Sequence, residues 1–243
     1  MKRISKLTAV IIMVVITATG CTDLELVRAS NNISTQSHYI EDYNGVEIAS
    51  AIDADITYTN TDEGITIEAN DNLHQYLIVD KSNGNLRIKL RRGVNVKGRY
   101  TIKAHISTGN LLDQFSASGA SNIVVDGLTT ADYVGISLSG ASRFNGDISA
   151  QDLSVHLSGA SNANLSGESA MFDAVLSGAS TLNSYDLVVD EADFGLSGAS
   201  QASLTVNGSM DVVASGASVV RYRGNGSSHH IELSGGSQLI KMD

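Results

Sequence analysis

Residues 156–167 read HLSGASNANLSG, and the motif SGAS within this stretch recurs along the chain at a nearly constant spacing. Such regular copies indicate a repeat architecture. They argue against a catalytic serine, because a nucleophile needs one unique base and one oxyanion hole. We therefore interpret the serines as structural. The copies begin at Ser118, Ser139, Ser158, Ser177, Ser197, Ser215 and Ser234, and the last reads SGGS.

The residues that flank each motif alternate between apolar and polar side chains. Those five, three and one positions before the first serine are nearly all apolar, as in Leu153, Val155 and Leu157. This period of two predicts a strand with one buried face. Apolar residues also recur five positions after the first serine, which predicts a second strand, and the motif glycine lies at the bend between the two. These residues are Ile123, Phe144, Ala163, Leu182, Ala202, Val220 and Leu239.

Two or three short strands in a repeat of this length predict an all-β fold, a right-handed parallel β-helix. It is a single-stranded solenoid of about 19 residues per coil, with a strand-rich N-terminal portion. Equivalent residues of neighbouring coils would stack, and we expect the motif hydroxyls to bond from coil to coil. A β-sandwich of hairpins would explain the alternation, but not the same motif at one phase of every repeat.

The chain before the repeats also contains alternating runs, separated by turn sequences such as SNGN, in which Asn83-Gly84 predicts a hairpin. We expect these strands to cover the N-terminal end of the stack, since an uncapped stack would expose strand edges. The predicted organisation is a lipoprotein signal peptide at 1–20, a polar tether at 21–36 and a β-helix domain at 37–243. Within the domain, 37–115 form the N-terminal strands and 116–243 the repeats.

The segment 1–20 has the pattern of an export signal. Three basic residues precede the apolar segment LTAVIIMVVI, and TATG leads directly to Cys21. That apolar segment is too short for a membrane-spanning helix, which needs about 20 residues. The cysteine at the expected cleavage point resembles a bacterial lipobox, although Ala18 replaces the more usual leucine. We expect an exported protein that is acylated on Cys21 and anchored to the outer membrane; a simple secretory signal is the alternative.

The net charge of the chain argues against one class of binding partner. Loss of the signal would lower the formal net charge from −10 to −13, because Lys2, Arg3 and Lys6 leave with it. So acidic a protein is a poor match for nucleic acid, which is bound through basic surfaces. Attachment to an anionic membrane would depend on the lipid. Cys21 is the only cysteine, which excludes a disulfide within the chain.

The SGAS tract behind strand-rich residues and a lipoprotein signal resembles the putative auto-transporter adhesin, head GIN domain family. The resemblance covers about residues 38–240, and the repeated SGAS carries it. Members are secreted or surface lipoproteins that are frequent in Bacteroides-like bacteria. The resemblance implies a parallel β-helix and an adhesive role, and it brings no catalytic residues.

One column of carboxylates is a candidate cation site. Asp173, Asp193 and Asp211 each lie four residues before a motif, so stacking would place them in an outward ladder about 5 Å apart. Like charges opposite each other destabilise a sheet, and Ca²⁺, which takes several oxygen ligands, could offset this. The simpler interpretation is that the carboxylates splay into water. No other metal is indicated, because the six histidines form no ligand pattern.

Two further sets of residues have alternative interpretations. Asn145, Asn164 and Asn183 lie six residues after the first serine, and stacked amides would stabilise the coils. Basic residues concentrate in the N-terminal strands, where they could face an anionic glycan or simply form a solvated face. These are Arg87, Lys89, Arg91, Arg92, Lys97, Arg99 and Lys103.

The most direct functional hypothesis is a non-catalytic envelope lipoprotein that binds a glycan or protein along a rigid face. The alternatives are a β-helix polysaccharide lyase or hydrolase, with its site near the basic strands, and a structural envelope component. Large catalytic side chains are few in the repeats, which argues against a hydrolase.

Overall fold

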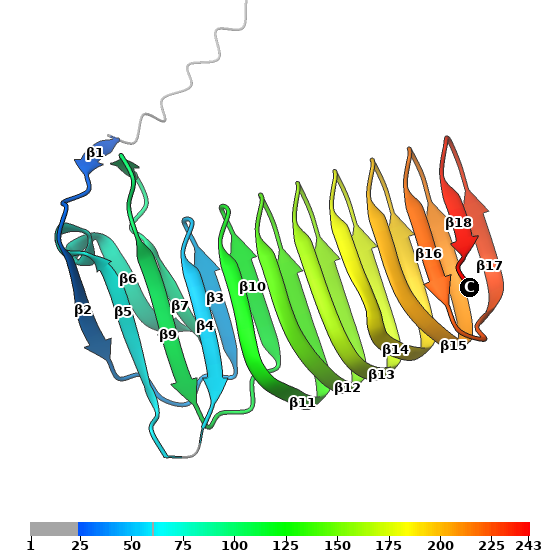
Figure 1. Ribbon diagram of the computed structural model, residues 1–243, viewed down its shortest axis with the longest axis horizontal. Coiled ribbons are helices and arrows are strands. Elements are labelled where there is room, and N and C mark those ends of the chain that lie inside the picture. Colours follow the sequence, from blue (N-terminus) through cyan, green and yellow to red (C-terminus); the bar gives the residue numbers. More distant parts are fainter. Residues whose placement is uncertain (1–23, 60) are drawn as a thin grey trace, which may run out of the picture.

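The computed structural model describes residues 24–59 and 61–243. This part of the chain is nearly all β-structure and contains a β-solenoid of about seven turns, with about 19 residues in each. The coils stand side by side along the long axis, with narrow turns along one edge and wide bends along the other (Figure 1). The predicted parallel β-helix is confirmed.

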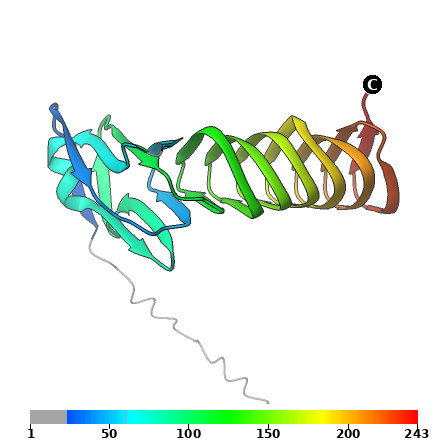
Figure 2. The same ribbon diagram turned by 90° about the horizontal axis from the view of Figure 1, so that it is seen from below.

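The described chain forms eighteen strands and one short 3₁₀ helix, η1. Seen from below, the wide bends cross the solenoid one after another (Figure 2). The elements are β1 (Glu25–Arg28), β2 (Ile33–His38), β3 (Gly45–Ala49), β4 (Asp53–Tyr58), β5 (Gly64–Asn70), η1 (Asp71–Tyr76), β6 (Leu77–Ser82), β7 (Asn85–Leu90), β8 (Val94–Lys97), β9 (Ile102–Thr108), β10 (Gln114–Ser118), β11 (Asn122–Leu138), β12 (Arg143–Leu157), β13 (Asn162–Leu176), β14 (Thr181–Leu196), β15 (Gln201–Ala214), β16 (Val219–Arg223), β17 (Ser227–Leu233) and β18 (Gln238–Lys241).

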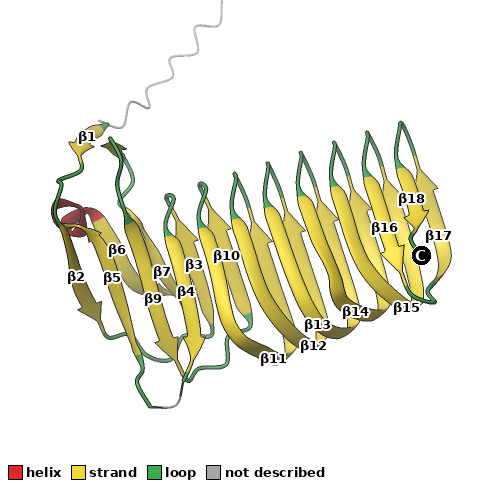
Figure 3. Cartoon of the chain, in the orientation of Figure 1, coloured by secondary structure: helices red, strands yellow, loops and turns green. Residues whose placement is uncertain are grey.

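Each central coil consists of one long strand and one SGAS turn. Strands β11 to β15 have 14 to 17 residues, and each bends midway between the two sides of the solenoid (Figure 3). The expectation of two or three short strands per coil was therefore wrong. The reason is that neighbouring coils bend at the same place, so parallel pairing continues around the bend, as in Thr129 opposite Ile148.

The motif turn is stacked as tightly as the strands. The Ala179 N–H donates to the Gly159 carbonyl of the preceding coil at 2.7 Å, and the same bond recurs in the next two turns. Gly178 has φ +76°, which disfavours a side chain, and a Cβ there would lie 2.5 Å from the Gly159 oxygen. The motif glycine is thus required by both conformation and space.

The two serines of the motif have different roles. The second serine is buried, and its hydroxyl donates to the carbonyl of the first serine in its own turn, as Ser161 does to Ser158 at 2.7 Å. The hydroxyl of the first serine makes only long contacts with the coil before it, as from Ser158 to the Leu138 carbonyl at 3.3 Å. The prediction that the motif hydroxyls bond from coil to coil was therefore wrong. The backbone groups of neighbouring turns already pair with each other, so the tight turn satisfies its own carbonyl.

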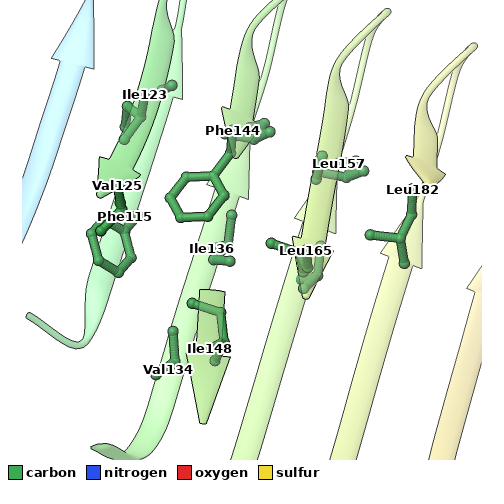
Figure 4. Packing of buried hydrophobic residues seen from close by; sticks show 14 of the residues in the cluster. Phe115, Ile123, Val125, Val134, Ile136, Phe144, Ile148, Leu157, Leu165 and Leu182 are labelled. Atoms are coloured by element: carbon green, nitrogen blue, oxygen red, sulfur yellow. The ribbon is translucent and has the colours of Figure 1, made fainter. Parts of the chain in front are cut away.

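The interior of the solenoid is filled by the predicted apolar columns (Figure 4). Large and small side chains alternate along a column, as where Phe144 lies beside Ala163 in the next coil and both are fully buried. Phe144 also contacts Phe115, with ring centroids 5.2 Å apart. Alternation of this kind fills the space between coils at a constant coil spacing.

The N-terminal strands extend the stack and then cover its end. β3 and β4 pair in parallel with β10 and β11 on one side, and with β7 and β9 on the other. β2, β5 and β6 add antiparallel pairs beyond them, so the parallel stack ends in antiparallel strands, as expected of a cap. The predicted hairpin is confirmed, with Asn83 and Gly84 at φ 52° and 82° between β6 and β7.

Part of the predicted tether belongs to the fold. β1 pairs in parallel with β8, and β2 with β5 in antiparallel fashion, so residues 24–36 are not the free tether that their polar composition predicted. Pairing of their backbone holds them in place, and Val27 adds a buried side chain to the core. The signal peptide and Cys21 lie outside the described residues. Within the described ranges, no helix is long and apolar enough to cross a membrane.

Candidate binding grooves on the solenoid

The predicted aspartate ladder lies on the outside of the strands that lead into the SGAS turns. Asp193 is opposite Asp173 on one side and Asp211 on the other, as the spacing predicts. Two residues earlier in each coil, a second outward column runs parallel to the ladder. A shallow groove of about 450 Å³ lies over these columns. The second column comprises Tyr133, Asp152, Met171, Glu191 and Ser209.

This groove, called the acidic groove below, carries five carboxylates: Asp152, Asp173, Glu191, Asp193 and Asp211. Partial burial, followed by repulsion from Asp211 and Asp173, raises the pKa of Asp193 above its ordinary value. Both neighbouring carboxylates therefore disfavour the charged form of Asp193, as expected for like charges in adjacent coils. Such a surface attracts cations and hydrogen-bond donors.

The ends of the ladder have polar partners. His156 Nε2 lies 3.8 Å from Asp173 Oδ1, and the His230 N–H donates to Asp211 Oδ1 at 2.9 Å. Nowhere in the described part of the chain do three or more His, Cys, Asp or Glu side chains form a group that could hold a metal ion. Calcium binding by Asp173, Asp193 and Asp211 therefore gains no support from the geometry and stays a prediction.

The predicted asparagine ladder lies on the other side of the SGAS turns. Asn145 and Asn164 are opposite each other, and Asn164 Nδ2 donates to Asn145 Oδ1 at 2.7 Å. Asn183 follows one coil further and is exposed. A groove of about 460 Å³ crosses these three coils. It is called the amide groove below.

An irregularity in β14 shapes one end of the amide groove. The coil from Ser177 to Ser197, which contains β14, is one residue longer than the coil before it, and its pairing with β13 is interrupted after Ala163. Within the interruption Ser184 is buried, and its Oγ accepts the Leu165 N–H at 2.9 Å. The next two residues, Tyr185 and Asp186, line the groove. Bulges that redirect side chains in this way are common beside binding sites.

Three of the seven basic residues predicted in the N-terminal strands form ion pairs within the described part of the chain. Arg87 contacts Asp80 at 2.7 Å, Lys89 contacts Glu47 at 3.2 Å, and Arg91 contacts Glu25 at 2.8 Å. The Arg87 guanidinium, through hydrogen bonds, lowers the pKa of Asp80. At these three residues the pairs favour the charge-balanced face over a groove for an anionic glycan.

Several groove residues were missed from the sequence. Tyr133, Met171 and Glu191 share a column six positions before the motifs, and alignment of the coils in register would have identified it. The contact of the Arg223 guanidinium with the Tyr185 ring, 4.2 Å from its centroid, had no signal of that kind, because the irregularity in β14 moves Tyr185 out of register.

The comparisons with known proteins agree with this architecture. One family model matches residues 42–226, and its description is "putative auto-transporter adhesin, head GIN domain". The chain belongs to this family. Among curated proteins, none matches this GIN-domain chain.

Solved structures with the same fold include proteins of Bacteroides and Parabacteroides species. A putative adhesin from Bacteroides fragilis aligns with a TM-score of 0.76 and 18% identity, over 88% of this chain and 99% of the other. A putative lipid binding protein from Parabacteroides distasonis aligns with a TM-score of 0.72 and 14% identity, over 90% and 100%. A putative adhesin from Parabacteroides merdae aligns with a TM-score of 0.67 and 16% identity, over 90% of this chain and 100% of the other. At such identities the likeness concerns the fold alone.

Proposed function

We propose that this GIN-domain protein is a non-catalytic binding protein that holds an extended ligand, a glycan or a protein, along one face of its solenoid. The observation that carries the proposal is that both outer grooves run across consecutive coils and are lined by columns of equivalent residues. A ligand that lies along the axis can meet the same kind of group in each coil. The adhesin description of the family supports the same role.

The place of action in this proposal is the outside of the bacterial cell. Adhesin-like relatives indicate an exported or cell-surface protein. We further propose a lipid anchor on Cys21 in the outer membrane, because basic residues and an apolar segment precede this cysteine. The anchor would leave the solenoid free to project from the surface.

The experiment is a binding screen of the chain from Thr22 onward against arrays of glycans and of host surface proteins, with analysis of every bound glycan for cleavage. We expect binding without products. Two variants separate the faces: Asp173, Asp193 and Asp211 replaced by asparagine, and Asn145, Asn164 and Asn183 replaced by alanine. Loss of binding in one variant only would identify the face. Cleavage products would refute the proposal in favour of an enzyme, and binding to no array member would refute it as well.

A further inference from the structure

The amide groove has hydrogen-bonding groups that the fold does not use. Asn145 and Asn164 are half-buried and Asn183 is exposed. The bond from Asn164 Nδ2 to Asn145 Oδ1 is the one hydrogen bond that these three side chains make with the residues that the structure describes. The Asn145 amide NH₂, the Asn164 Oδ1 and the whole Asn183 amide remain available to a ligand.

A purely structural ladder would continue from coil to coil, and this one is interrupted. In β14, buried Ser184 pairs in register with Leu204 of β15, and its Oγ accepts the Leu165 N–H at 2.9 Å. The regular pairing of β14 with β13 stops after Ala163 and resumes at Gly167, opposite Leu187. Asn183 is thereby left outside the bonded ladder. The extra length places Tyr185 and Asp186 along the groove. In this coil Asn183 is not bonded to the other asparagines of the ladder, and Tyr185 and Asp186 line one end of the groove.

The occupant that these groups fit is rich in hydroxyl groups. An amide both donates and accepts, as a hydroxyl does, so a row of free amides matches a row of sugar hydroxyls. Asp147 and Asp186 also line the groove and would repel sulfate or carboxylate groups. The buried side chains of Val125 and Leu165 also line the groove and give its floor an apolar part, which suits the C–H faces of a sugar ring.

An extended peptide is a poorer match. Peptides that add to a sheet need a free strand edge, whereas β12, β13 and β14 are each paired on both sides. The groove crosses these strands and offers side-chain groups rather than backbone groups.

We propose that the amide groove binds a neutral oligosaccharide that lies along the solenoid axis, with one sugar unit at each of the three asparagine rungs. Neighbouring coils are about 4.8 Å apart, which is close to the advance of one pyranose unit in an extended chain. The inference rests on the proposed binding function and assigns its ligand class and its face.

The experiment is calorimetric titration of the full-length protein in detergent with neutral 1,4-linked hexasaccharides of glucose, mannose and N-acetylglucosamine, and with hexagalacturonate as the anionic probe. We expect at least one neutral hexasaccharide to bind, and hexagalacturonate to bind at least about tenfold more weakly. Shorter oligomers of the bound sugar should reach the full affinity at about three units, and the single sugar should not bind measurably.

The variants test the rungs directly. Asn183→Ala removes no hydrogen bond of the described fold, and we expect it to weaken binding about fivefold to tenfold. Asn164→Ala should do the same, with its thermal unfolding measured because it also loses the bond to Asn145. Asn162→Ala is the matched control: Asn162 lies two residues before Asn164 on β13, faces outward and is not part of the groove lining. Its affinity should equal that of the unaltered protein.

The outcomes separate this inference from the proposed function. Binding that is unaffected by Asn164→Ala and Asn183→Ala would overturn the assignment to the amide groove and leave a binding protein. Absence of binding to every neutral hexasaccharide, or equally tight binding of hexagalacturonate, would overturn the ligand class. Failure of the array screen as well would remove the proposed function itself.

Discussion

The stacking of motif glycines is tested most directly by Gly178→Ala. Gly178 lies in the turn between β13 and β14, with φ +76°. A Cβ built there lies 2.5 Å from the Gly159 carbonyl oxygen, 3.2 Å from its nitrogen and 3.3 Å from its carbonyl carbon. All three atoms belong to backbone, so no side chain can turn aside. The two coils must separate locally, or the turn must change its conformation.

The cost has two parts. The left-handed conformation costs a residue with a Cβ about 1–2 kcal/mol. Overpacking against backbone costs about 1–3 kcal/mol more, and separation of the coils weakens the 2.7 Å bond from Ala179 N to Gly159 O. We therefore expect Gly178→Ala to lower the free energy of unfolding by about 2–5 kcal/mol, a large share of the about 5–15 kcal/mol of a typical domain.

The assay is urea unfolding followed by far-UV circular dichroism, with hydrogen exchange of the Ala179 amide to locate the damage. Gly195→Ala is the control, because Gly195 lies in β14 and a Cβ there meets only Val175 Cγ2, at 3.9 Å. Its free energy of unfolding should stay equal or rise by up to about 1 kcal/mol. A loss below about 1 kcal/mol in Gly178→Ala, or equal losses in both variants, would show that close stacking of the turns does not hold the coils.

Three further predictions concern single groups. Ser180→Ala removes a buried hydroxyl that bonds within its own turn, and chemical denaturation should show a loss of about 1 kcal/mol. Ser184→Ala leaves the buried Leu165 N–H without its acceptor, so the loss should be about 1–3 kcal/mol and exchange of that amide should speed up. Carboxyl NMR titration should give Asp193 a pKa above the ordinary aspartate value. The raised pKa means that the charged form of Asp193 is disfavoured in the folded state. The contribution of Asp193 to stability is therefore present at acid pH and is lost as the pH rises through its folded pKa. Asp211→Asn should lower this pKa, and an unchanged value would contradict repulsion along the ladder.

The stack was predictable because each coil repeats the same constraints. Once Leu176 and Leu196 are placed at the same phase, the residues just before them are also in register, and the column of Asp173 and Asp193 follows. The glycine of the turn could be predicted as well, since a tight bend with positive φ favours glycine. Periodicity therefore determined the core, the turn and the composition of the outer columns.

What escaped prediction depends on departures from the period. The longer interval between Ser177 and Ser197 shows that the coil of β14 contains an extra residue, but it does not say where that residue is accommodated. The structure places the irregularity between Ala163 and Gly167 of β13, opposite residues 183–186 of β14, where Tyr185 and Asp186 form one end of the amide groove. The position of β3 and β4 between β7 and β9 on one side and the repeats on the other is likewise a long-range pairing without a local signal.

The division between inward and outward residues explains why fold and ligand must be inferred separately. Inward columns and turn glycines determine whether the coils stack, and outward residues such as Asn164 or Asp193 can change without disturbing that stack. Relatives with 14–18% identity accordingly keep the architecture, at TM-scores of 0.67–0.76. The ligand of one member therefore does not carry over to another through the shared fold. It has to be read from the outer columns of each chain, which here present carboxylates on one face and free amides on the other.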